Sequence, residues 1–74
     1  MKIYLNEFSR ITNFVNEVSK LEPNVDALSN NYIVNAKSIL GLMSLNLSVP
    51  IEVKIRTEDE TIVKKFEELC KRYS

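Results

Sequence analysis

The chain has 74 residues, of which 45% are hydrophobic, and its ten basic and ten acidic residues cancel. This length allows one domain, residues 1–74, and the hydrophobic fraction is too high for a disordered chain. The balanced charge argues against nucleic-acid and membrane partners, and a single cysteine excludes an internal disulfide. With no signal peptide and no apolar stretch long enough to span a bilayer, the sequence predicts a soluble cytoplasmic protein.

The first two predicted elements are a strand and an amphipathic helix. Residues 1–5 alternate between apolar and polar, which predicts a half-buried strand. From residue 8 to residue 21 the apolar residues recur at helical spacing. We expect Asn6 or Ser9 to cap this helix, and Pro23 to end it. The expected buried stripe contains Phe8, Ile11, Val15 and Val18, with Phe14 and Leu21 beside it.

A β-hairpin is predicted next. Residues 25–28 and 32–36 are short runs rich in apolar and β-branched residues, separated by Ser29-Asn30-Asn31. Because Asn tolerates positive φ better than most residues, this separator predicts a tight turn. We expect Val25, Ala27 and Val34 to face inward.

Residues 38–45 predict about two turns of helix that are apolar nearly all round. So short a helix cannot bury every apolar side chain. We expect Leu42 and Leu45 to lie inside. Both a core position and an exposed docking position fit Ile39, Leu40 and Met43, since an exposed apolar patch implies a partner or self-association.

A strand and a final helix complete the chain. Residues 51–56 alternate between apolar and charged, which predicts a strand with one wet face. Thr57-Glu58-Asp59-Glu60 matches a capping box, so we expect Thr57 to start a helix whose buried stripe includes Cys70. Amphipathic helices and one-faced strands in this order predict an α+β domain with the helices on one side of an antiparallel sheet.

Little in the sequence indicates catalysis. The chain contains no histidine, the commonest general base and zinc ligand, and a lone Cys70 cannot form a Cys–His pair. No metal, nucleotide or phosphate-loop motif is present, and the single Gly41 cannot make a glycine-rich cradle. We expect a protein that is not an enzyme and that holds no cofactor and no metal ion.

One segment resembles a known family. Asn35-Ala36-Lys37-Ser38-Ile39-Leu40-Gly41-Leu42-Met43-Ser44-Leu45 is similar to the regulatory-serine region of HPr, the phosphocarrier of the bacterial phosphoenolpyruvate:sugar phosphotransferase system. The family pattern there is approximately N-x-K-S-[IL]-[ML]-G-[VL]-[ML]-S-L, which this segment fits throughout. A ferredoxin-like sandwich has nearly the same element order, but the extra short helix before the last strand favours HPr. The resemblance implies an HPr-like open-faced β-sandwich, βαββαβα, with a four-stranded antiparallel sheet and three helices on one face.

The resemblance also implies roles for this segment. Ser38 matches the serine that a dedicated kinase phosphorylates in many relatives, and it also suits a helix cap, with Lys37 beside it. Ile39, Leu40 and Met43 match the exposed apolar residues with which HPr docks onto partner proteins. The implied partners are components of the phosphotransferase system or HPr kinase.

The family's phosphate acceptor is missing. HPr carries G-[IL]-H-A-R-P-A between the first strand and the first helix, where the His accepts phosphate. Here the shorter region reads Asn6-Glu7-Phe8-Ser9-Arg10-Ile11-Thr12, and an ungapped alignment from the serine motif puts Glu7 at the His position. A surface Glu at a helix start usually interacts with the helix dipole, and its carboxylate could also mimic the charge of the phosphorylated form.

Three functions are therefore open. The first is an HPr-family protein without histidine phosphotransfer that binds a protein through Ile39, Leu40 and Met43 and is modulated at Ser38. The second is a self-associating structural module in which the same patch forms a homodimer. The third is an active carrier with a non-His acceptor.

Overall fold

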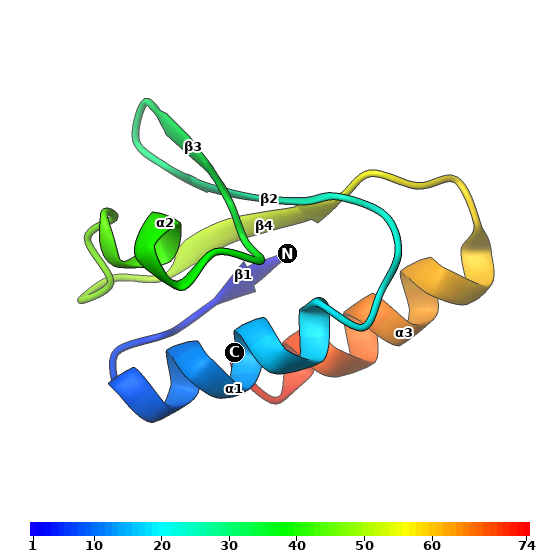
Figure 1. The fold of residues 1–74 in the computed structure, drawn as a ribbon, viewed down its shortest axis with the longest axis horizontal. Helices are drawn as coiled ribbons and strands as arrows, with labels where there is room; N and C mark the ends of the chain where they lie inside the picture. Colours follow the sequence, from blue (N-terminus) through cyan, green and yellow to red (C-terminus); the bar gives the residue numbers. More distant parts are fainter.

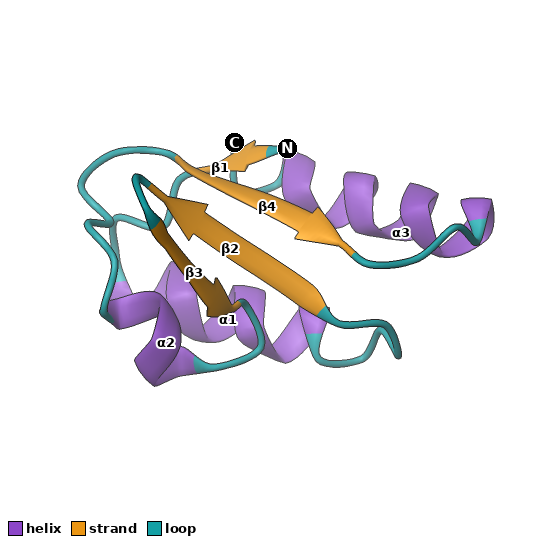
Figure 2. Ribbon diagram, turned by 90° about the horizontal axis from the view of Figure 1, so that it is seen from above, coloured by secondary structure: helices purple, strands orange, loops and turns teal.

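The computed structural model describes residues 1–74. The elements are β1 (Lys2–Ile3), α1 (Phe8–Val18), β2 (Val25–Ser29), β3 (Tyr32–Asn35), α2 (Ile39–Met43), β4 (Ile51–Ile55) and α3 (Glu60–Lys71). All four strands form one antiparallel sheet in the order β1-β4-β2-β3 (Figure 1). The three helices lie on one side of this sheet and leave its other face open (Figure 2). The predicted fold class is therefore confirmed.

The core lies between the sheet and the helices. Its largest fully buried side chain is Phe14 of α1, whose ring meets the ring of Tyr73 edge-on with 5.3 Å between centroids. Val25 and Ala27 are buried and the half-buried Val34 packs against the core, so all three face inward as predicted. Cys70 is fully buried, and this burial raises the pKa of its thiol to about 11. A thiol in this position acts as a small core residue.

The hairpin between β2 and β3 has the predicted tight turn. Ser29 pairs with Tyr32, so the turn contains only two residues, and Asn30 adopts a φ of 54°. This left-handed conformation is one that Asn tolerates. On the open face, Arg56 forms an ion pair with Asp26 of the neighbouring strand at 2.6 Å. The charged residues of β4 thus line a solvated sheet face, as predicted.

The two ends of α1 differ from the prediction. Glu7 is the N-cap residue and its side chain makes no capping hydrogen bond, so the predicted caps Asn6 and Ser9 are both wrong. Ser9 already lies inside the helix, where its carbonyl accepts a hydrogen bond from the Thr12 hydroxyl at 3.1 Å. The helix ends at Val18 rather than at residue 21. The next residues form tighter i to i−3 hydrogen bonds, which close a turn ahead of the proline.

The start of α3 also differs. Asp59 is the N-cap, and its Oδ1 accepts hydrogen bonds from Thr61 N–H at 2.9 Å and Ile62 N–H at 3.4 Å. Thr57 instead accepts a hydrogen bond from Asp59 N–H and forms a turn before the helix. The predicted cap at Thr57 is wrong because Asp59 is close enough to reach the first free N–H groups with a charged acceptor, which the helix dipole favours.

Candidate functional site

Only residues 36–38 separate the end of β3 from the start of the short helix α2. Ser38 has an extended backbone, and its Oγ accepts a hydrogen bond from Gly41 N–H at 3.0 Å. Ser38 N–H in turn donates to the carbonyl of Asn35 at 3.0 Å. A Cβ at position 41 would lie 3.3 Å from both the Asn35 carbonyl oxygen and Ser38 Oγ. Glycine at position 41 therefore lets the first turn of α2 sit close to the strand, and the predicted cap at Ser38 is present.

The two sides of α2 differ sharply in exposure. Leu42 is fully buried and Leu45, just after the helix, is 8% exposed, so both lie inside as predicted. Leu40 is 82% exposed and Met43 is 51% exposed. Ile39 is half-buried and packs against the core. We call Leu40, Met43 and the accessible part of Ile39 the α2 surface.

Lys37 does not point to the Ser38 hydroxyl. Its Nζ donates to the backbone carbonyls of Leu21 and Glu22, which lie in the segment between α1 and β2. The side chain therefore ties that segment to the start of α2. A phosphate on Ser38 would meet Lys37 only if these hydrogen bonds broke.

The start of α1 is where the sequence alignment placed the family histidine. Glu7 is exposed at the helix N-terminus, with φ −133° and ψ 148°. Phe8 is 61% exposed, so its predicted place on the buried stripe is wrong, because the first turn of α1 lies beyond the core that begins at Ile11. Arg10 is half-buried, and its Nε donates to the Tyr4 carbonyl at 2.8 Å. The arrangement leaves one carboxylate and no imidazole at this helix start.

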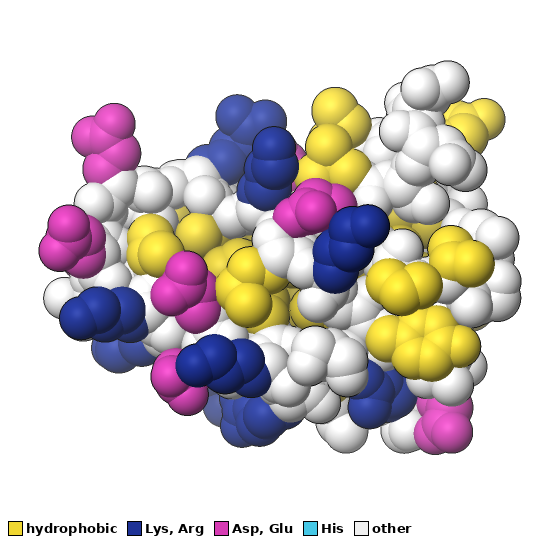
Figure 3. Space-filling view, turned by 180° about the vertical axis from the view of Figure 1, so that it is seen from behind, with side chains coloured by type: hydrophobic (Ala, Val, Ile, Leu, Met, Phe, Trp, Pro, Cys, Tyr) yellow, Lys and Arg dark blue, Asp and Glu magenta, His cyan; other side chains and the backbone are white.

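Exposed Phe8 is a feature that the periodicity argument missed. Figure 3 shows hydrophobic side chains gathered near the start of α1 and the segment that joins α2 to β4. Helices α1 and α2 are in contact, so this apolar region and the α2 surface belong to the same end of the molecule. The only sequence signal for it is that Phe8 directly follows the charged residue at which the helix starts.

A polar cluster joins α1 to the C-terminal end of α3. Glu17 accepts hydrogen bonds from the Tyr73 hydroxyl and from the Arg72 guanidinium, and the Arg10 guanidinium lies 5.5 Å from the Tyr73 ring centroid. Burial, followed by the hydrogen bond to Glu17, raises the pKa of Tyr73 to about 12. Because these groups satisfy one another, the cluster holds the two helices together and offers no free nucleophile.

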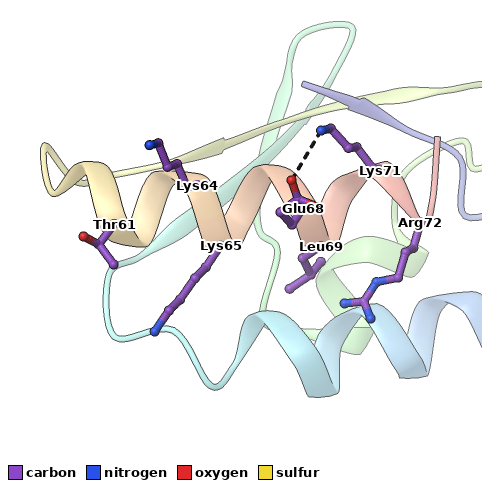
Figure 4. Close-up of a pocket in the computed structure, with 7 residues that line it drawn as sticks. All are labelled: Thr61, Lys64, Lys65, Glu68, Leu69, Lys71 and Arg72. Carbon is purple, nitrogen blue, oxygen red and sulfur yellow. Dashed lines mark hydrogen bonds and ion pairs between the residues drawn. The ribbon is translucent and has the colours of Figure 1, made fainter.

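The largest surface depression lies along α3 (Figure 4). Its rim is charged, and Lys71 forms an ion pair with Glu68 at 3.4 Å. Lys64 and Lys71 point to one side of the helix and Lys65 and Arg72 to the other, so the side chains do not converge on one point (Figure 4). No group of three His, Cys, Asp or Glu side chains is arranged to hold a metal ion. None of the helices combines the length and the apolar character needed to cross a membrane.

Comparison with known proteins identifies the family. Residues 9–72 match a family described as the PTS HPr component phosphorylation site. The chain belongs to the HPr family. The matched segment contains Ser38 and the α2 surface, and it begins after Glu7. No curated protein sequence matches this chain.

Two solved structures support the family assignment. HPr-C-His from Thermoanaerobacter tengcongensis superposes with a TM-score of 0.76 at 26% identity, covering 96% of this chain and 89% of the other. Crh, the catabolite repression containing protein of Bacillus subtilis, superposes with a TM-score of 0.68 at 27% identity, covering 100% and 87%. That Crh structure is described as a domain-swapped, intertwined dimer. The predicted HPr resemblance is thus confirmed for the family and the fold.

Proposed function

We propose that this HPr-family chain is a regulatory, protein-binding module of the sugar phosphotransferase system that carries no phosphate on histidine. It acts in the cytoplasm, docks onto a partner protein through the α2 surface, and is modulated by phosphorylation of Ser38. The observation that carries the proposal is the 82% exposure of Leu40 on a helix whose neighbouring Leu42 is fully buried. A large exposed aliphatic side chain beside a flexible Met suits an adaptable docking surface.

The absence of histidine supports a role other than phosphate transfer. Transfer in this family needs an imidazole nitrogen at a helix N-terminus to attack phosphorus, and the chain contains no imidazole. Glu7 stands at the start of α1 and has no side-chain hydrogen bond to the helix. Its negative charge near the positive end of the helix dipole suits a dipole partner, and a fixed charge there would resemble that of a phosphorylated carrier.

Ser38 is the proposed point of regulation. Ser38 is half-exposed at the helix start, and its Oγ hydrogen-bonds only to Gly41 N–H. A phosphate at this atom would meet free N–H groups and the positive dipole end, while adding negative charge next to the apolar Leu40. Phosphorylation would therefore change the charge of the α2 surface without requiring a new fold.

The partner that we propose is HPr kinase or another protein of the phosphotransferase system. Titration calorimetry of HPr kinase against the wild type and against a Leu40→Ala/Met43→Ala double variant tests this. We expect the double variant to bind at least tenfold more weakly. Lys64→Ala is the control, since Lys64 is exposed on α3 and lies outside the α2 surface. Equal affinity for all three proteins would contradict docking through α2.

Regulation at Ser38 has its own test. Incubation with HPr kinase and ATP, followed by intact-mass measurement, should add one phosphate to the wild type and none to Ser38→Ala. An unmodified wild type would remove the regulatory part of the proposal, while the docking part would still rest on calorimetry. Phosphate on both proteins would place the modification at another residue.

Self-association through α2 is the second candidate. The domain-swapped dimer of the relative Crh is an example of self-association on this scaffold. Sedimentation separates the two. A dimer that Leu40→Asp dissociates would support the homodimer, and a dimer that Leu40→Asp leaves intact would remove α2 from the contact.

A further inference from the structure

Strand β3 forms one edge of the sheet and has a single neighbour, β2 (Figure 2). Hydrogen-bonded and non-hydrogen-bonded residue pairs alternate along antiparallel strands. Directly after β3, Ala36 N–H donates to the Val25 carbonyl at 2.9 Å. By alternation, Tyr32 and Val34 also hydrogen-bond to β2, while Ile33 and Asn35 direct their backbone groups outward.

The outward groups of β3 are only partly used. The Asn35 carbonyl accepts the hydrogen bond from Ser38 N–H that starts α2. The N–H and carbonyl of Ile33 point away from β2 and receive no bond from the loops or side chains. At the centre of this edge, one donor and one acceptor are therefore free to pair with another strand.

The edge also lacks the side chains that usually block pairing. Exposed edge strands in monomeric proteins tend to carry lysine, proline or an inward-pointing charge. Residues 30–35 read Asn-Asn-Tyr-Ile-Val-Asn, with neither a charge nor a proline. Tyr32 and Ile33 are 70% and 64% exposed, and as consecutive strand residues they lie on opposite faces of the sheet. Apolar surface therefore flanks the free backbone groups on both faces.

We propose that β3 pairs antiparallel with β3 of a second copy of this chain, about a two-fold axis at Ile33, so that one continuous sheet spans both copies. In this register Ile33 faces itself and exchanges two backbone hydrogen bonds with its symmetry mate. Tyr32 then lies opposite Val34 of the second copy on the helix side of the sheet. Aromatic and β-branched residues form favourable cross-strand pairs.

The sequence of the edge favours a second copy over a foreign strand. A register shifted by two residues would place Asn35 opposite Ile33 and lose the apolar match. The Ile33-centred register repeats each pairing twice and juxtaposes no charges, as a two-fold contact requires. The pairing groups belong to β3 and include neither Leu40 nor Met43, so this contact is distinct from one that forms through α2.

Sedimentation over a series of concentrations tests the proposal. Because the paired strands are short, the interface is small and the dimer is weak. The dimer should therefore form only toward the higher protein concentrations. We expect the average mass to rise toward twice the monomer mass, and Ile33→Lys to abolish the rise. Leu40→Lys is the control, since it adds the same charge at another exposed apolar residue. Urea unfolding of both variants verifies that they are folded.

Amide hydrogen exchange tests the register itself. The Ile33 amide is free in the monomer and should exchange quickly when dilute, then slow as the protein is concentrated. The amides of the α2 surface should keep the same rate throughout. A monomer at every concentration, a dimer in which Ile33 still exchanges quickly, or equal loss of dimer in both lysine variants overturns the proposal.

Discussion

Two leucines on α2 provide the sharpest test of how this helix is oriented. Leu40→Ala and Leu42→Ala make the same chemical change two positions apart on one short helix. Leu42 is fully buried and Leu40 is 82% exposed. Leu and Ala have similar helix propensities, so the backbone contribution nearly cancels between the two variants.

The expected difference in stability is large. Removing a fully buried leucine side chain costs about 2–5 kcal/mol, through lost burial and the cavity left behind. A substitution at an exposed site changes stability by about 0.5 kcal/mol or less. A domain of this length has a total unfolding free energy of roughly 4–11 kcal/mol. Leu42→Ala should therefore remove a large fraction of the stability, while Leu40→Ala should leave it nearly intact.

Urea unfolding followed by circular dichroism measures both values. With an m-value of about 1 kcal/mol/M, Leu42→Ala should lower the midpoint by about 2 M or more. Leu40→Ala should shift it by about 0.5 M or less. Comparable losses in both variants would mean that Leu40 is a core residue, and the α2 surface would then not exist as described.

Three other predictions concern helix caps and alkaline pH. Ser38→Ala should cost about 1 kcal/mol in urea unfolding, because Gly41 N–H loses its acceptor. Asp59→Ala should cost about as much and Thr57→Ala less, and the reverse order would restore Thr57 as the cap of α3. Stability should also fall above pH 9, because folding raises the pKa of Cys70 from 9.0 to about 11 and that of Tyr73 from 10.0 to about 12. Each raised pKa stabilises the folded protein fully below the ordinary pKa of the group, and this stabilisation is lost as the pH rises through the pKa of the folded state. A urea midpoint that is constant from pH 8 to pH 11 would contradict both shifts.

Local patterns predicted the elements well because most of the signals are local. The cap at Ser38, the turn at Asn30 and the alternation of β4 each depend on residues a few positions apart. A helix of two turns cannot bury every side, and from this constraint the sequence predicted a buried Leu42 but left Leu40 open between a core and an exposed position. These features needed no knowledge of the distant chain.

The errors in the helix caps were local, but the others came from contacts between distant segments. Helical periodicity places Phe8 on the apolar stripe, but it cannot say how far the core extends beneath the helix. Lys37 reaches carbonyls 15 and 16 residues earlier, so its distance from a phosphate on Ser38 was not visible in the sequence. Arg10 likewise lies against the ring of Tyr73, which is brought close only when α3 packs beside α1.

The central claim is that an HPr scaffold without histidine serves protein binding and not phosphate transfer. Incubation with phosphoenolpyruvate and the upstream enzyme of the phosphotransferase system, followed by intact-mass measurement, tests it most directly, with an HPr that retains its histidine as the positive control. We predict that the control gains a phosphate while this chain stays at its original mass. A phosphate that appears on the wild type and disappears in Glu7→Gln would contradict the account and identify an active carrier with a carboxylate acceptor.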